Sequence, residues 1–160
     1  MRITIATIAL FTLVVSCDSE RMYEKNFDFD SRFWLPSEQP DFEFVIRDSI
    51  ETYNLYCNIR NSVSYPYSRL FINAYLQDSA GGVLQKKLTE VLLFDPQTGK
   101  PFGESGIGDI YDQRVPVLTD FIFPYQGKYK MKFEHYMRVD SLQGILAVGL
   151  RVEKYRPSND

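Results

Sequence analysis

The chain has 160 residues, of which 44% are hydrophobic, and its 18 basic and 21 acidic residues give a formal net charge of −3. No basic patch stands out against this acidic balance, so the composition argues against a nucleic-acid partner. A chain of this length can bury enough surface to form one domain around one core. Its 11 tyrosines and 12 phenylalanines occur in short alternating runs broken by Gly, Pro, Asn and Asp, which favours sheet.

The first 16 residues are predicted to be a cleaved lipoprotein signal peptide. Residues 1–2 carry a positive charge, residues 3–15 are apolar or threonine, and residues 14–16 place small or medium side chains before Cys17. The apolar run is shorter than the ~20 residues that span a bilayer. An ordinary secretory signal would not require a cysteine at the cleavage point, so the pattern predicts acylation of Cys17. Two or three acyl chains, at ~0.8 kcal/mol per buried methylene, would make membrane attachment effectively permanent.

Residues 17–29 are predicted to hold the lipid anchor, a short spacer and a first strand over residues 21–29. Residues 30–155 are predicted to form a single antiparallel β-sandwich domain with at most one short helix, and residues 156–160 a frayed tail. Alternation of apolar and polar side chains marks the strands of this domain. It is found in residues 42–47, 53–60, 70–76, 115–123, 128–138 and 146–152.

Two further predictions concern which strands pair with each other and whether one ambiguous segment is a strand or a helix. A turn containing Asp140, Ser141 and Gly144 separates the last two alternating runs, which predicts an antiparallel hairpin of residues 128–137 with 146–152. Residues 83–94 match the spacing of a helix and also of a buried strand, and the all-β context favours a strand.

Three aromatic residues are candidates for contact with a partner. Trp34, the single tryptophan, lies in the predicted loop 30–40, where packing over the sandwich edge is the more common use of so large a ring. Tyr65 and Tyr67 flank a proline in the predicted loop 61–68, where they either contact a protein or a sugar or fold back over the core. The longest polar, glycine-rich loop runs from Asp95 to Asp109, and the stretch from Asp95 to Asp112 is a second candidate contact surface.

This glycine-rich loop does not fit known ligand motifs. Residues 99–101 place a proline where a phosphate-binding loop needs Ser or Thr, and the preceding glycine of that motif is absent. Asp109 and Asp112 can supply oxygen atoms to calcium, but they lack the alternating carboxylates and final glutamate of an EF-hand. Exposed acids in a β-turn are therefore the favoured interpretation, and we predict no metal site.

Residues with catalytic potential fall on apolar faces of the predicted strands. Cys57 alternates with buried apolar residues, where a thiol is inert. His135, the single histidine, shares its face with Tyr129, Met131 and Phe133, and one histidine cannot build a multi-histidine zinc site. Paired carboxylates for glycoside hydrolysis cannot be identified from sequence separation. We predict no catalytic residue and no cofactor.

Six segments, taken together and in order, carry a resemblance that covers essentially the whole chain after residue 16. They are CDSERMYEKN (17–26), YNLYCNIRN (53–61), YPYSRLF (65–71), LFDPQTGKPFGESGIGDIYD (93–112), FPYQGKYKMKFEHYMRVD (123–140) and VGLRVEK (148–154). They resemble the gliding motility lipoprotein GldH family of Bacteroidota. The resemblance implies a cell-envelope lipoprotein of the outer membrane that serves a motility machinery tied to type IX secretion, and it carries over only Cys17, as the site of lipid attachment.

The leading hypothesis is a non-enzymatic accessory protein held at the membrane by acyl chains on Cys17. It would dock other envelope or gliding-machinery proteins through Tyr65, Tyr67 and the loop from Asp95 to Asp112. The alternative is a surface carbohydrate-binding lipoprotein that uses Trp34 and the loop tyrosines. Family members also occur in bacteria that do not glide, so a wider envelope role stays open.

Overall fold

The computed structural model describes residues 20–156, and this part of the chain forms strands and no helix. The predicted all-β class is thus confirmed, and within these residues no helix is available to span a membrane. Cys17, the predicted signal peptide and residues 157–160 of the predicted tail lie outside the described residues. The strands are β1 (Arg21–Asp28), β2 (Phe33–Trp34), β3 (Asp41–Ile46), β4 (Thr52–Ser62), β5 (Arg69–Asp78), β6 (Val83–Leu92), β7 (Glu104–Ser105), β8 (Ile110–Ile122), β9 (Gly127–His135), β10 (Leu142–Gln143) and β11 (Ile145–Lys154).

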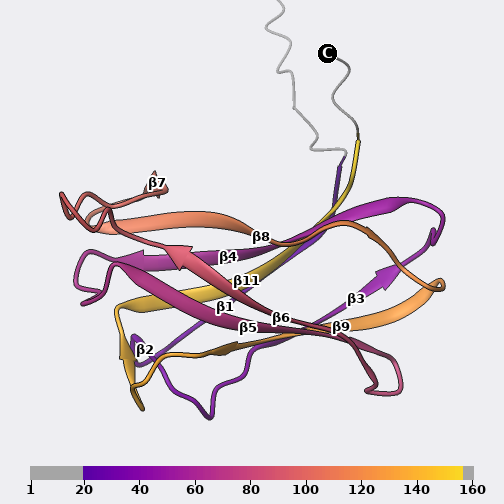
Figure 1. Ribbon diagram of the computed structural model, residues 1–160, viewed down its shortest axis with the longest axis horizontal. Helices are drawn as coiled ribbons and strands as arrows, with labels where there is room; N and C mark the ends of the chain where they lie inside the picture. The colour runs from indigo at the N-terminus through magenta and orange to yellow at the C-terminus, as the bar shows by residue number, and fades with distance from the viewer. Residues whose placement is uncertain (1–19, 157–160) are drawn as a thin grey trace, which may run out of the picture.

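The strands form two main antiparallel sheets that face each other as a sandwich (Figure 1). The five-stranded sheet has the order β1-β11-β4-β8-β7, and the four-stranded sheet has the order β3-β9-β5-β6. The short strands β2 and β10 pair separately, at the same end of the sandwich as β7 (Figure 1). The predicted sandwich is therefore present, with one additional two-stranded ribbon.

Strict alternation of side chains builds the core between the sheets. Every second residue of β4 is buried from Tyr53 to Asn61, and every second residue of β9 is buried from Tyr129 to His135. Successive side chains of a strand point to opposite faces, so these rows meet in the space between the two sheets. Strand β11 is buried almost throughout because it lies between β1 and β4. Residues 83–92, which also fitted a helix, form β6 because they pair with β5 along their length.

The predicted hairpin of residues 128–137 with 146–152 is wrong. Strand β9 pairs with β3 and β5 in the four-stranded sheet, whereas β11 pairs with β1 and β4 in the five-stranded sheet. The connection between them crosses from one sheet to the other and contributes β10 to the ribbon with β2. Alternation identifies the buried face of each strand, but it does not determine which strands pair.

The strand directions give the sandwich two distinct ends. At one end Lys154 N donates to Glu20 O at 3.0 Å, and Tyr155 N donates to Thr52 O at 2.8 Å. We call this the terminal end, and it also holds the connections 46–52 and 122–127. The connections 61–68, 93–109 and 136–144 lie at the opposite end, which we call the loop end. Figure 1 shows β7 and the β4–β5 connection on the side away from the β3–β4 and β8–β9 connections.

Trp34 is fully buried and serves the core. Its Nε1 donates to Glu38 O at 2.8 Å, and its ring stacks on Phe29 with the ring centres 5.3 Å apart. The His135 ring meets it edge-on at 5.4 Å. The structure supports the packing interpretation of Trp34, because the side chain has no exposed surface with which to contact a partner.

Cys57 and His135 both lie in the core, as their positions on apolar faces predicted. Burial raises the pKa of the Cys57 thiol, which keeps it protonated and unreactive. Burial also lowers the pKa of His135, and neither ring nitrogen has a hydrogen-bond partner within residues 20–156. Both groups are therefore held in their neutral forms.

Replacing Trp34 with alanine tests the packing interpretation. We expect Trp34→Ala to lower the free energy of unfolding by about 3–5 kcal/mol, because it leaves a cavity in the core and removes the hydrogen bond to Glu38. Urea denaturation followed by far-ultraviolet circular dichroism measures the loss. Leu35→Ala is the control, since this partly exposed neighbour should cost no more than about 0.5 kcal/mol. Equal effects of the two changes would contradict a core role.

Candidate functional site

Tyr65 and Tyr67, on either side of Pro66 at the loop end, have different surroundings. Tyr65 is buried: its hydroxyl donates to Arg69 O at 2.8 Å, and its ring stacks on Phe94 at 6.5 Å with an interplanar angle of 12°. Burial, with a smaller contribution from the neighbouring Tyr67, raises the pKa of the Tyr65 hydroxyl. Tyr67 meets Tyr65 edge-on at 5.6 Å and is 40% exposed. Tyr65 therefore folds back over the core and fixes Tyr67, which presents its ring to solvent.

Two surface hollows adjoin Tyr67. One, of about 370 Å³, lies between the connection that carries Tyr65 and Tyr67 and the turn at residues 95–101. The other, of about 600 Å³, is largely apolar and is lined by Tyr67, Phe71, Leu88, Tyr136, Met137, Arg138 and Val139. The structure thus brings together the two segments that the sequence nominated as contact surfaces, with Tyr67 where the two hollows meet.

The segment from Asp95 to Asp112 is more ordered than the predicted loop. The Asp95 carboxylate accepts hydrogen bonds from the backbone N–H groups of Gln97 and Thr98, both at 2.8 Å. These bonds, the one from Thr98 first, lower the pKa of Asp95. The predicted loop of residues 95–109 contains the short strand β7 and ends just before β8 begins at Ile110. Asp112 belongs to β8.

The acids considered for calcium do not gather into a metal site. Asp112 forms an ion pair with Arg60 across β4 and β8, with Oδ1 and Nε 2.9 Å apart. Within the described residues, no group of three or more His, Cys, Asp or Glu side chains is arranged to hold a metal ion.

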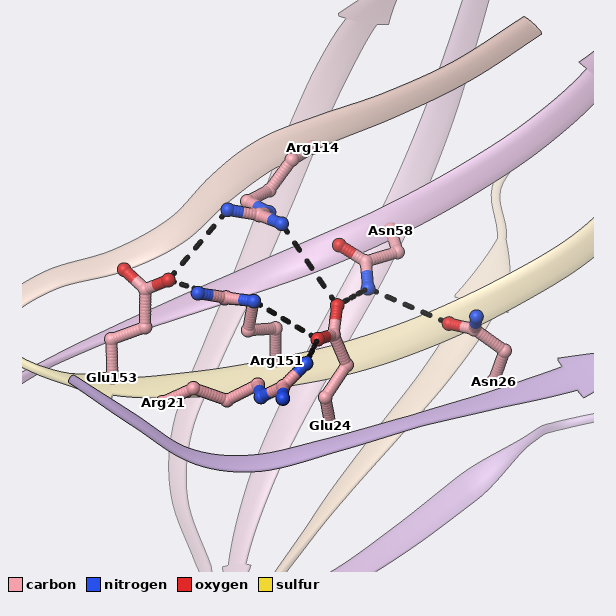
Figure 2. Close-up of polar contacts among 7 residues, drawn as sticks. All are labelled: Arg21, Glu24, Asn26, Asn58, Arg114, Arg151 and Glu153. Carbon is pink, nitrogen blue, oxygen red and sulfur yellow. Dashed lines mark hydrogen bonds and ion pairs between the residues drawn. The ribbon is translucent and has the colours of Figure 1, made fainter. Parts of the chain in front are cut away.

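A polar cluster that sequence analysis did not identify lies on the outer face of the five-stranded sheet (Figure 2). The side chains come from four strands that are neighbours in space but distant in sequence: β1, β11, β4 and β8. Glu24 on β1 lies directly opposite Arg151 on β11. Asn58 on β4 lies directly opposite Arg114 on β8. The cluster consists of Arg21, Glu24, Asn26, Asn58, Arg114, Arg151 and Glu153.

Arg151 lies at the centre of the polar cluster and is almost completely buried. Its Nη1 lies 2.9 Å from Glu24 Oε2, and its Nε contacts Glu153 Oε1. Arg114 approaches the same two carboxylates, at 3.6 Å from Glu153 and 4.0 Å from Glu24 (Figure 2). A buried guanidinium is tolerated only when charged partners surround it, and removal of one partner leaves an uncompensated charge.

Glu24 connects the first strand to its neighbours. Partial burial by itself would raise the pKa of Glu24, but hydrogen bonds from Asn58, Arg21 and Arg151 outweigh it and lower the pKa below its ordinary value. Asn58 Nδ2 lies 2.9 Å from Glu24 Oε1, and Arg21 Nη1 lies 3.2 Å from Glu24 Oε2. The Glu24 carboxylate is thus held in its charged form by groups on three strands.

Gly149 makes room for the polar cluster. It lies on β11 between Asn26 of β1 and Asn58 of β4, and the Asn26 side chain crosses over it towards Asn58 (Figure 2). A methyl group at position 149 would collide with Asn26 Oδ1 and lie 2.8 Å from Lys25 O. The position therefore requires glycine for close approach.

A polar hollow of about 560 Å³ adjoins the cluster. Most of the charged side chains around it are already paired with one another, as Glu24 is with Arg151 and Asp112 with Arg60. This arrangement can fasten β1 across the sheet. The residues that line the polar hollow are Glu24, Asn26, Asn58, Arg60, Gly103, Glu104, Asp112, Gln113 and Arg114.

Comparison with known proteins identifies the family. Residues 21–152, which include both sheets, match the family model described as GldH lipoprotein. The chain belongs to the GldH lipoprotein family. The resemblance drawn from six sequence segments is thereby confirmed.

Two curated relatives of this GldH family member align over nearly their whole length. A gliding motility lipoprotein GldH homolog of Christiangramia forsetii is 33% identical and covers 92% of this chain and 93% of its own. Gliding motility lipoprotein GldH of Flavobacterium johnsoniae is 29% identical and covers 96% and 99%. Among solved structures, the infectious bursal disease virus VP2 subviral particle gives a TM-score of only 0.38 at 15% identity, over 97% of this chain and 38% of that one.

The lowered pKa of Glu24 makes a testable contribution to stability. A carboxylate whose folded-state pKa lies below its ordinary value of 4.5 stabilises the fold fully above that pH and loses this effect as the pH falls through the folded-state pKa. We expect Glu24→Gln to lower the free energy of unfolding by about 1–3 kcal/mol at pH ~7, and the difference to shrink as the pH falls towards ~3. Urea denaturation across this range measures it.

Glu90→Gln is the matched control for Glu24→Gln, because Glu90 forms an exposed ion pair with Arg69. Such a pair is worth no more than about 1 kcal/mol. A difference between wild type and Glu24→Gln that stays constant with pH would contradict the role of the ionised Glu24.

Adding a methyl group at Gly149 tests whether the cluster depends on this close approach. We expect Gly149→Ala to lower the free energy of unfolding by about 1–3 kcal/mol, since Asn26 must leave its place above β11. Gly106→Ala is the control, because a methyl group there would make only ordinary contacts, the nearest at 3.5 Å. Thermal denaturation compares the two variants, and equal melting temperatures would argue against a requirement for glycine at position 149.

Proposed function

We propose that this chain is a membrane-anchored, non-enzymatic accessory protein of the envelope machinery for gliding motility and type IX secretion. The observation that carries the proposal is the alignment over almost the whole chain with two curated gliding motility lipoproteins. The anchor would be acyl chains on Cys17, and the membrane would be the outer membrane. Cys17 precedes Glu20 by three residues, so the domain would be held close to the bilayer.

The loop end is the proposed docking surface for other envelope or gliding-machinery proteins. It lies at the far end of the strands from Glu20 and so faces away from the proposed anchor. Tyr67 is exposed there, and its ring is held in place by contact with the buried Tyr65. An aromatic side chain that is fixed before binding loses little conformational entropy and is typical of the anchor residues of protein interfaces.

The apolar hollow beside Tyr67 favours a protein partner over a sugar. Its walls include Leu88, Met137 and Val139, whose aliphatic side chains match apolar side chains better than sugar hydroxyl groups. Trp34, on which the carbohydrate-binding alternative depended, is buried. Of the three aromatic residues that this alternative would use, Trp34, Tyr65 and Tyr67, Tyr67 has the exposed ring.

Site-specific photo-crosslinking in cells tests the docking surface. A photoreactive phenylalanine analogue replaces Tyr67, and in a second strain it replaces Tyr125, which is equally exposed but lies at the terminal end. We expect adducts with envelope or secretion proteins from position 67, identified by mass spectrometry, and none of these adducts from position 125. Introducing Cys17→Ala together with the analogue at position 67 should abolish the adducts, because the domain is no longer held at the membrane.

The same adducts from both positions would contradict a docking surface at the loop end. So would the absence of protein adducts from position 67 when the chain is folded and acylated. If the purified protein instead binds a surface polysaccharide and Tyr67→Ala abolishes that binding, the carbohydrate-binding alternative replaces the accessory role.

A further inference from the structure

Four exposed apolar or aromatic residues lie at the terminal end of the sandwich. Two of them are tied to Thr52: Ile122 lies directly opposite it on β8, and Tyr155 donates its backbone N–H to Thr52 O. Ile50 comes two residues before Thr52, and Tyr125 comes three residues after Ile122. Ile50 is 90% exposed and Ile122 58%. We call Ile50, Ile122, Tyr125 and Tyr155 the terminal rim.

The loop that carries Ile50 is held in a defined shape. The Asp48 carboxylate accepts a hydrogen bond from Ile50 N at 3.0 Å, and the buried Tyr53 donates its hydroxyl proton to Asp48 O at 2.6 Å. The exposure of Ile50 therefore results from a fixed turn that projects the side chain into solvent. A large aliphatic side chain so presented gains free energy when an apolar environment covers it.

Two of the acidic side chains beside the terminal rim already have partners. Glu51, next to Ile50, forms an ion pair with Lys154, whose Nζ lies 3.4 Å from its Oε1. Asp48 uses its carboxylate within the turn. Tyr125 and Tyr155 have rings that suit the boundary between hydrocarbon and water, where the hydroxyl group stays hydrated.

The proposed anchor emerges beside the terminal rim. Glu20 O accepts a hydrogen bond from Lys154 N, one residue before Tyr155. The Cα atoms of Cys17 and Glu20 can be no more than ~11 Å apart, because three residues separate them. Acyl chains on Cys17 would therefore keep this end of the sandwich, and not the loop end, within reach of the lipid headgroups.

We propose that the terminal rim lies directly on the bilayer surface, with Ile50 and Ile122 inserted among the lipid headgroups. The inference rests on the proposed acylation of Cys17 and adds a second contact that fixes the orientation of the domain. A lone acylated tether would let the domain turn freely, whereas the rim and the tether together direct the loop end away from the membrane.

Fluorescence quenching in vesicles tests the contact. Ile50→Cys is made in the full acylated chain, labelled with an environment-sensitive fluorophore, and reconstituted into phosphatidylethanolamine and phosphatidylglycerol vesicles that contain a nitroxide-labelled lipid. Cys57 is buried, so the label goes to the new thiol. Ile107→Cys is the matched control, because Ile107 is 95% exposed and lies at the loop end. We expect nitroxide to quench the label at position 50 at least about twofold and to leave position 107 unchanged.

Equal quenching at the two positions would overturn the proposal. A blue-shifted emission at position 50 without quenching by lipid would also overturn it, since protein and not bilayer would then cover the rim. Mass spectrometry of the acylated peptide and co-flotation with vesicles are scored separately. Loss of either would contradict the anchor itself, whereas an anchored chain without quenching contradicts only the contact of the rim.

Discussion

The Arg151 guanidinium lies between the carboxylates of Glu24 and Glu153, and this contact holds the first strand against the rest of the five-stranded sheet. Strand β1 contributes little apolar surface to the core, since all of its residues are exposed or only half-buried. Its attachment therefore depends on the backbone ladder with β11 and on the polar cluster. The cluster adds geometric definition as well as stability to β1, although the burial of charge is itself costly. It fixes the register of β1 by allowing Glu24 only one place opposite Arg151.

Alternation of side chains was sufficient to predict the buried faces of the sandwich but not the order of its strands. The inward rows of β4 and β9 follow from period-two spacing, because that spacing is a property of each strand alone. Pairing depends on contacts between distant segments, which is why β9 and β11 were wrongly joined as a hairpin. The polar cluster was missed for the same reason: Glu24, Asn58 and Arg151 come together only once β11 lies between β1 and β4.

The candidate contact residues illustrate a further limit of sequence reasoning. Trp34 and Tyr65 both lie in segments rich in turn residues, yet both are buried because other segments cover them: Phe29 packs on Trp34, and Phe94 on Tyr65. Tyr67 lies only two residues after Tyr65 and points to solvent. Sequence alone left packing and binding open for all three residues, since the exposure of a ring in a connection is decided by what folds over it.

The position of β1 has a mechanical consequence for a protein held at one end. Seven residue pairs join β1 to β11, from Arg21 with Glu153 to Asp28 with Ala147. A pull through the proposed anchor, opposed by the proposed partner at the loop end, would act along the axis of β1. The load is then shared by the whole ladder in shear, and the hydrogen bonds cannot open one after another like a zipper. The edge strand that adds least to the core is thus placed where tension is distributed over its full length.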